Sequence, residues 1–172
     1  MMQMLAAGGV PVLIDGERPP DEDNPRGYFE FDPVKRTRRD PAWLAAARGR
    51  AVKIVHLLLY DLPAGYAFRI IFMMRKIEEV LASQRAMLHR MGKPGARLSD
   101  AQLARIFQGQ LEKVAKWLRQ RPDISVLDVH YNDLIVDPAR SIEAIQSFLG
   151  CPLLDAAAMA RAVDPALYRQ RQ

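Results

Sequence analysis

The chain has 172 residues, 49% apolar and 26% charged, which is typical of one soluble globular domain with a sizeable core. The net charge of +5 favours anionic ligands, and the apolar runs fall well short of the ~20 residues that a membrane span needs. A single cysteine, Cys151, excludes an internal disulfide and suits a reducing cytoplasm. We therefore expect residues 1–172 to fold as a single cytoplasmic domain.

The first residues predict a helix that has no capping residue before it. Residues 1–7 have a helical composition and stop at Gly8 and Gly9, a helix-ending signal. Because no N-cap precedes them, we expect the chain to begin inside a helix. Residues 10–14 are predicted to form a short buried strand. Residues 15–26 are predicted to form a polar loop of a length that is usually functional or mobile.

Three apolar segments are predicted to be core strands, at residues 51–56, 68–74 and 124–129. Such runs are typical of strands covered on both faces, as in a parallel sheet. Helical periodicity and capping residues predict further helices at about residues 40–47, 77–90, 99–121, 137–149 and 154–163. Strands that alternate with helices indicate an α/β fold with a parallel sheet flanked by helices.

The strand at residues 68–74 is followed at once by an arginine, which suggests an anion site. Ligands of open parallel sheets bind outside the carboxyl ends of the strands, and Arg75 stands at such an end. Ser83 follows eight positions later in the next helix, so the two side chains form a candidate phosphate clamp. The plainer interpretation is that Arg75 is an ion-pair partner of Glu78 or Glu79.

Of the three histidines, His56 is the best candidate for acid–base chemistry, because it ends a predicted strand at the same edge of the sheet. A structural, hydrogen-bonded histidine at this place is the alternative. Other chemistries find no support: the histidines and Cys151 lack zinc-ligand spacing, so no metal site is expected. Neither the GxGxxG nor the GxxxxGK[ST] signature is present.

At this point the sequence resembles a known family, the sulfotransferases. Residues 69–84, RIIFMMRKIEEVLASQ, are similar to the family segment in which a strand ends in arginine and a serine follows eight residues on. The resemblance implies that Arg75 and Ser83 bind the 3′-phosphate of 3′-phosphoadenosine 5′-phosphosulfate (PAPS). Residues 52–63, VKIVHLLLYDLP, resemble the family strand that carries the catalytic histidine, which implies that His56 is the base. Val55 stands where the family usually has threonine.

Two further segments extend the resemblance. Residues 129–150, VHYNDLIVDPARSIEAIQSFLG, are similar to the family's tyrosine–acidic–aspartate–leucine strand exit and the helix after it, with Asn132 in place of the acidic residue. Residues 24–35, NPRGYFEFDPVK, resemble a segment of bacterial sulfotransferase-like proteins. The implied fold is a P-loop-NTPase-like parallel sheet. Family members open with a central strand and a PKSGT or PRSGT loop that binds the 5′-phosphosulfate, and this chain is expected to begin just past that loop.

The resemblance implies transfer of a sulfuryl group from PAPS to a hydroxyl or amine acceptor. Without the 5′-phosphosulfate loop we expect weak nucleotide binding and little turnover, because charge stabilisation at the transferring group is usually the largest catalytic effect. The alternative is a non-catalytic remnant that binds nucleotide or a protein, whose exposed sheet edge would favour a homo-oligomer. Nucleic-acid binding ranks last, because the basic run at residues 35–39 has no interleaved aromatic residues.

Overall fold

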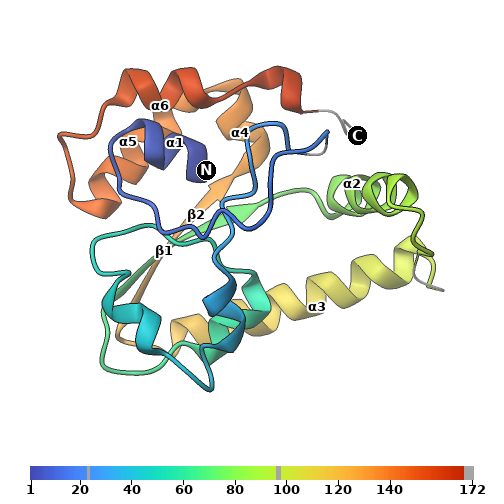
Figure 1. Ribbon diagram of the computed structural model, residues 1–172, viewed down its shortest axis with the longest axis horizontal. Coiled ribbons are helices and arrows are strands. Elements are labelled where there is room, and N and C mark those ends of the chain that lie inside the picture. Colours follow the sequence, from blue (N-terminus) through green and yellow to red (C-terminus); the bar gives the residue numbers. More distant parts are fainter. Residues whose placement is uncertain (23, 96–97, 169–172) are drawn as a thin grey trace.

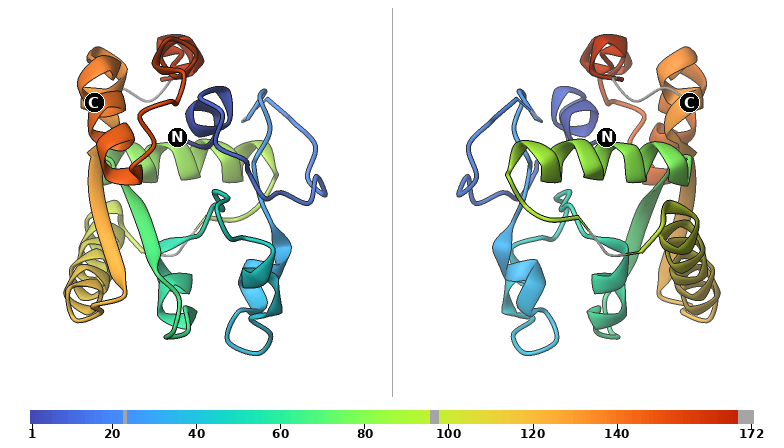
Figure 2. Two further views of the ribbon diagram at one scale, coloured as in Figure 1. Left: turned by 90° about the vertical axis from the view of Figure 1, so that its left-hand side faces the viewer. Right: turned by 90° about the vertical axis from the view of Figure 1, so that its right-hand side faces the viewer.

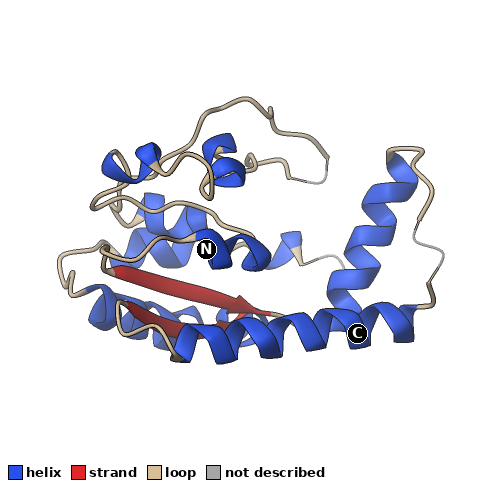
Figure 3. Cartoon of the chain, turned by 90° about the horizontal axis from the view of Figure 1, so that it is seen from below, coloured by secondary structure: helices blue, strands red, loops and turns tan. Residues whose placement is uncertain are grey.

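The computed structural model describes residues 1–22, 24–95 and 98–168. Two strands, β1 (Phe68–Met74) and β2 (Ile124–His130), pair in parallel along their whole length. Figure 3 shows them side by side and pointing the same way. β1 is apolar at every position except Arg69, as expected of a strand covered on both faces. The parallel pairing and the flanking helices confirm the predicted α/β fold class.

The helices predicted at residues 1–7, 77–90, 99–121, 137–149 and 154–163 are confirmed to within two residues at each end. Residues 40–47 form only a short 3₁₀ helix, and the short helix after β2 was not predicted. The bounds of the helices are α1 (Met2–Ala7), α2 (Ile77–Arg90), α3 (Asp100–Arg119), α4 (Tyr131–Val136), α5 (Pro138–Leu149) and α6 (Ala156–Ala162), with 3₁₀ helices η1 (Asp32–Arg36), η2 (Ala42–Ala45), η3 (His56–Asp61) and η4 (Pro165–Leu167). α3 opens with the predicted capping box, in which the Gln102 amide donates to Ser99 Oγ and the Ser99 amide donates to Gln102 Oε1. Asp137 caps α5 by accepting a hydrogen bond from the Ala139 amide. No helix in the described ranges is long and apolar enough to cross a membrane.

The two strands lie between two layers of helices. α1, α5 and α6 cover one face, and α3 with η3 covers the other (Figure 1). Alternate residues of β1 serve both layers: Ile71 and Met73 pack against the first apolar cluster, and Ile70 and Phe72 against the second. The first cluster is built on Met4, Leu5, Val129, Leu134, Ile142, Ile145 and Met159, and the second on Leu59, Leu62, Val114, Leu118 and Ile124.

The short helix α1 is held by its packing against α6 rather than by a cap. Figure 2 shows the two helices side by side in both views. α1 has no side-chain cap at its N-terminus, which agrees with the missing N-cap in the sequence. At its other end Gly8 is buried so closely against Met159 that a Cβ on Gly8 would lie 2.5 Å from the Met159 Cγ. The glycine that ends the helix therefore also allows α1 and α6 to approach each other.

Two of the predicted strands are wrong. Residues 10–14 and 51–56 meet in a single parallel bridge, Val12 to Ala51, and neither segment forms part of the β1–β2 sheet in the described part of the chain. Beyond that bridge Val55 is 56% exposed, and His56 begins η3 instead of ending a strand. The apolar pattern correctly indicated contact with the core, because Ile54 packs against the second cluster. A strand also needs a paired neighbour along its length, which this segment lacks.

Candidate active site

The carboxyl ends of the two strands meet at one edge of the sheet. Met74, the last residue of β1, lies opposite His130, the last residue of β2. Arg75 and Tyr131 therefore follow their strands at neighbouring positions. In Figure 1, α2 lies beyond the arrowheads of the strands and α4 begins directly after β2. This is the edge at which open parallel sheets bind their ligands.

Glu79, in the first turn of α2, is the centre of a hydrogen-bonded cluster at this edge. Its side chain is fully buried, with 0% exposed. Arg75 Nε donates to Glu79 Oε2 over 3.0 Å. Asn132 Nδ2 and the Tyr168 hydroxyl donate to Glu79 Oε1 over 3.1 and 2.5 Å. The one carboxylate thus links the end of β1, the helix α2, the helix α4 and the segment after η4.

The hydrogen bonds decide the charge state of this cluster. Burial would raise the pKa of the Glu79 carboxyl, but hydrogen bonds from Tyr168, Arg75 and Asn132, together with the charge of Arg75, outweigh burial and leave that pKa below its ordinary value. The hydrogen bond to Glu79 raises the pKa of Tyr168, and burial adds to the effect. At neutral pH Glu79 is therefore ionised and Tyr168 is protonated.

Two tyrosine rings enclose the Arg75 guanidinium from other sides. The Arg75 Cζ lies 4.7 Å from the ring centre of Tyr131 and 5.7 Å from that of Tyr168. The two rings pack edge to face, with their centres 5.6 Å apart. Burial raises the pKa of Tyr131, which therefore stays neutral beside the guanidinium. The carboxylate and the two rings together fix the position of a side chain that is still 24% exposed.

A cavity of about 160 Å³ opens beside Arg75 and brings His56 to the same place. Its lining residues are His56, Met73, Met74, Arg75, Ile77, Val80, Phe107 and Leu111. The Nε2 of His56 lies 3.2 Å from the Oε1 of Gln110, and the imidazole packs against the ring of Phe107. Although residues 51–56 form no core strand, the chain still brings His56 to the edge of the sheet, where α3 holds its ring.

Ser83 is not joined to Arg75. It is exposed, four residues after Glu79 on the next turn of α2. Within the described residues no hydrogen bond connects Ser83 with Arg75, and Ser83 is not among the residues that line the 160 Å³ cavity. The structure thus brings His56 and Arg75 together and leaves Ser83 outside their cavity.

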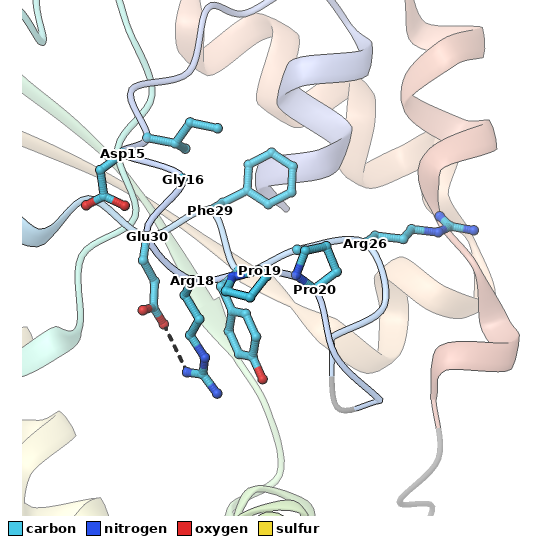
Figure 4. Close-up of a pocket in the computed structure, with 11 residues that line it drawn as sticks. Asp15, Gly16, Arg18, Pro19, Pro20, Arg26, Phe29 and Glu30 are labelled. Atoms are coloured by element: carbon cyan, nitrogen blue, oxygen red, sulfur yellow. Dashed lines mark ion pairs between the residues drawn. The ribbon is translucent and has the colours of Figure 1, made fainter.

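A second hollow, of about 210 Å³, lies within the loop of residues 14–30 (Figure 4). Here the Arg18 guanidinium stacks 3.3 Å from the ring centre of Tyr28 and pairs with Glu30 over 3.6 Å. The Tyr28 hydroxyl donates to the carboxylate of Asp21. Arg26, at the edge of the hollow, extends towards the segment after α6 and pairs with Asp164 over 2.6 Å. These contacts fold the long polar loop onto itself and attach it to the segment after α6.

The described ranges contain no group of three or more His, Cys, Asp or Glu side chains able to hold a metal ion.

Two members of the cluster around Glu79, Asn132 and Tyr168, were not predicted from the sequence. The position of Glu79 four residues after Arg75 did suggest an ion pair, and the structure contains it. Asn132 could have been suspected, because it follows a strand at the same edge. Tyr168 gave no signal, because it lies 89 residues from Glu79 and only the tertiary fold brings the two together.

The fold and the site thus define an α/β protein with an arginine–carboxylate pair and a histidine at the carboxyl edge of its sheet, where open parallel sheets bind their ligands. A family model described as "Sulfotransferase domain" matches residues 30–165, well over half of the chain. The chain belongs to the sulfotransferase family, as the resemblance indicated, and sulfuryl transfer is the general activity of that domain. No curated protein and no solved structure matches the chain.

Proposed function

We propose that the chain takes part in sulfuryl transfer from PAPS to a hydroxyl or amine acceptor. In this proposal Arg75 and Ser83 bind the 3′-phosphate of the donor and His56 is the base. The observation that carries it is that Arg75 and His56 line one cavity at the carboxyl edge of a parallel sheet. A fixed cation and a proton acceptor on one cavity are what the transfer of a group from an anionic donor requires.

The chemistry of the cavity fits the phosphate end of such a donor. Arg75 uses only Nε in its ion pair with Glu79. Its two Nη groups, each with two N–H donors, can therefore bind an anion as a fork. The cavity of about 160 Å³ is smaller than the roughly 300 Å³ of a small ligand pocket. We therefore expect it to hold only part of the donor, next to Arg75 and His56.

One ring nitrogen of His56 is available to act as the base. In the tautomer that carries its proton on Nε2, His56 donates to the Gln110 Oε1 and Nδ1 keeps a lone pair. In the proposed reaction Nδ1 takes the proton from the acceptor hydroxyl or amine. When bound, PAPS supplies the sulfuryl group, while Arg75 holds the phosphate end of the donor in place.

Calorimetric titration with adenosine 3′,5′-bisphosphate, the product of the donor, tests the nucleotide assignment. We expect Arg75→Ala to weaken binding by more than tenfold, or about 1.4 kcal/mol. Ser83→Ala should weaken binding by less than Arg75→Ala does, because Ser83 is exposed and offers a single hydroxyl donor to the phosphate. Arg119→Ala, an exposed arginine in the last turn of α3, is the matched control and should bind as the parent does.

Adenosine 5′-monophosphate is the control ligand, because it lacks the 3′-phosphate. Its affinity should be the same for the parent and for Arg75→Ala. If the parent is folded by circular dichroism and binds no bisphosphate, the donor assignment is wrong. A non-catalytic, protein-binding role would then rank first.

A further inference from the structure

We propose that Glu79 is a positioning residue, which fixes the guanidinium of Arg75 so that its two Nη groups face an anion in the adjoining cavity. The proposed function supplies only the identity of the anion, and the inference rests on that function to this extent. The starting observation is that a fully buried carboxylate takes the Nε of an arginine that lines the cavity.

The carboxylate is itself prevented from moving. Its Oε1 accepts from Asn132 in α4 and from Tyr168 after η4, while Oε2 accepts from Arg75. These three donors come from three parts of the chain, and together they restrict the side chain of Glu79 to one orientation. Asn132 also donates to the Tyr168 hydroxyl over 2.7 Å, so the two donors support each other.

The contact made through Nε determines the direction of the guanidinium. A carboxylate bound to both Nη groups would occupy the fork that an anion needs, whereas a carboxylate on Nε leaves it available. The ring of Tyr131, 4.7 Å from Cζ, restricts the plane in which the guanidinium can lie. The direction and the plane of the Arg75 guanidinium are thus both fixed before any ligand binds. Binding therefore has to offset a smaller loss of side-chain entropy.

A purely electrostatic role for Glu79 makes the opposite prediction. If Glu79 only neutralised Arg75, removing its charge would strengthen anion binding, because the positive charge would then be unopposed. If Glu79 positions Arg75, removing the charge weakens binding. The reason is that the amide of Glu79→Gln offers one acceptor oxygen to three donors and cannot hold them all. The sign of the change therefore separates the two roles.

The test follows the Arg75 Nε–H signal by NMR in the ¹⁵N-labelled chain, assigned by its loss in Arg75→Lys. Adenosine 3′,5′-bisphosphate and inorganic sulfate are titrated separately into the parent, Glu79→Gln and Glu78→Gln. Glu78→Gln is the matched control, because Glu78 is an exposed carboxylate in the same helical turn. We expect a rigid Nε–H in the parent, a mobile one in Glu79→Gln, and about tenfold weaker binding of both probes by that variant.

The outcomes separate this inference from the proposed function. If Glu79→Gln binds both probes as tightly as the parent, or more tightly, the positioning role is wrong even where the bisphosphate binds. If sulfate binds through Arg75, depends on Glu79 and is not surpassed by the bisphosphate, the positioning role stands and the nucleotide function fails. If neither probe shifts the Arg75 signal in the parent, both are wrong.

Tyr168→Phe keeps the test decisive if Glu79→Gln does not fold. This variant removes one donor to Oε1 and leaves the pair of Glu79 with Arg75 in place. We expect a smaller effect in the same direction, with increased motion of the Arg75 Nε–H and binding of both probes weakened about threefold. Unchanged motion and unchanged affinity in a folded Tyr168→Phe would overturn the inference.

Discussion

Arg75 and Glu79 form an ion pair with unequal burial: the carboxylate is 0% exposed and the guanidinium 24% exposed, with 3.0 Å between Nε and Oε2. A buried carboxylate is costly unless it is paired and hydrogen-bonded, and here three donors satisfy it. The partly exposed member of the pair borders the cavity. The free-energy cost of burial thus falls on Glu79, which fixes the guanidinium, while Arg75 stays accessible to a ligand.

The pH dependence of stability should report this pair. The pKa of Glu79 is lowered in the folded protein, so its stabilising contribution is complete above the ordinary value of about 4.5 and is lost as the pH falls through the folded pKa. In that window the unfolded chain binds more protons, and stability therefore rises with pH. Glu79→Gln should lower the free energy of unfolding at pH 7 by about 1–3 kcal/mol and flatten its dependence below about pH 4.5.

Urea titrations at a series of pH values measure both effects. Glu78→Gln should keep the slope of the parent, because it removes an exposed carboxylate outside the cluster. An unchanged slope in Glu79→Gln would mean that Glu79 does not contribute to the acid sensitivity of the fold.

Asn132 offers a second prediction, because the family pattern has an acidic residue at this position. The amide Nδ2 of Asn132 donates to Glu79 Oε1 over 3.1 Å, which an ionised aspartate could not do. Asn132→Asp should therefore place two carboxylates against each other and lower stability at pH 7 by about 1–3 kcal/mol. The loss should shrink towards acidic pH, where one of the two carboxylates takes up a proton.

The double variant Glu79→Gln/Asn132→Asp provides the control. It exchanges donor and acceptor, so it should be more stable than the sum of the two single changes predicts. Additive losses in chemical denaturation would show that Asn132 and Glu79 do not interact directly.

Elements whose signals are local could be predicted from the sequence. The capping box at Ser99 and the Asp137 cap lie within a few residues of the helices that they begin. The apolar run of β1 was likewise sufficient to predict its bounds. Residues 51–56 carry a similar apolar run, and they failed as a strand because pairing depends on a neighbour elsewhere in the chain. Local pattern predicts which segments contact the core, and tertiary pairing decides whether such a segment is a strand.

The site divides in the same way. The position of Arg75 after β1 and the four-residue spacing to Glu79 are local, and both were within reach of the sequence. The meeting of His56 with Gln110 joins residues 54 positions apart, and that of Tyr168 with Glu79 joins residues still further apart. No periodicity or sequence motif predicts either of these two contacts. The sequence position of His56 made it a candidate, the family resemblance implied its role as the base, and the fold supplied its surroundings.

Arg121 should be difficult to replace, even by lysine. Its Nη atoms donate to the carbonyl oxygens of Leu62 and Pro63 over 3.0 and 3.1 Å, and it also pairs with Asp123. These contacts join the end of η3 to the start of β2. Lysine cannot reproduce a planar fork with several donors, so Arg121→Lys should lower the free energy of unfolding by about 1–2 kcal/mol through the lost carbonyl contacts. Thermal unfolding measures this change. Arg119→Lys, at an exposed position, is the control and should change the free energy of unfolding by less than about 0.5 kcal/mol.

Two glycines in contrasting surroundings give the last prediction. A Cβ on Gly8 would lie 2.5 Å from the Cγ and 2.8 Å from the Sδ of Met159, a buried side chain of α6. Gly8→Ala should therefore force α1 away from α6 and lower stability by about 1–3 kcal/mol. Gly109 lies within α3, and a Cβ there would meet no atom within 4 Å beyond the backbone of its own helix. Gly109→Ala should therefore raise stability by about 0.5–1 kcal/mol through the better helix propensity of alanine. Thermal unfolding of the two variants measures both, and a neutral Gly8→Ala would show that Met159 can move aside and that the close approach of the two helices is not needed.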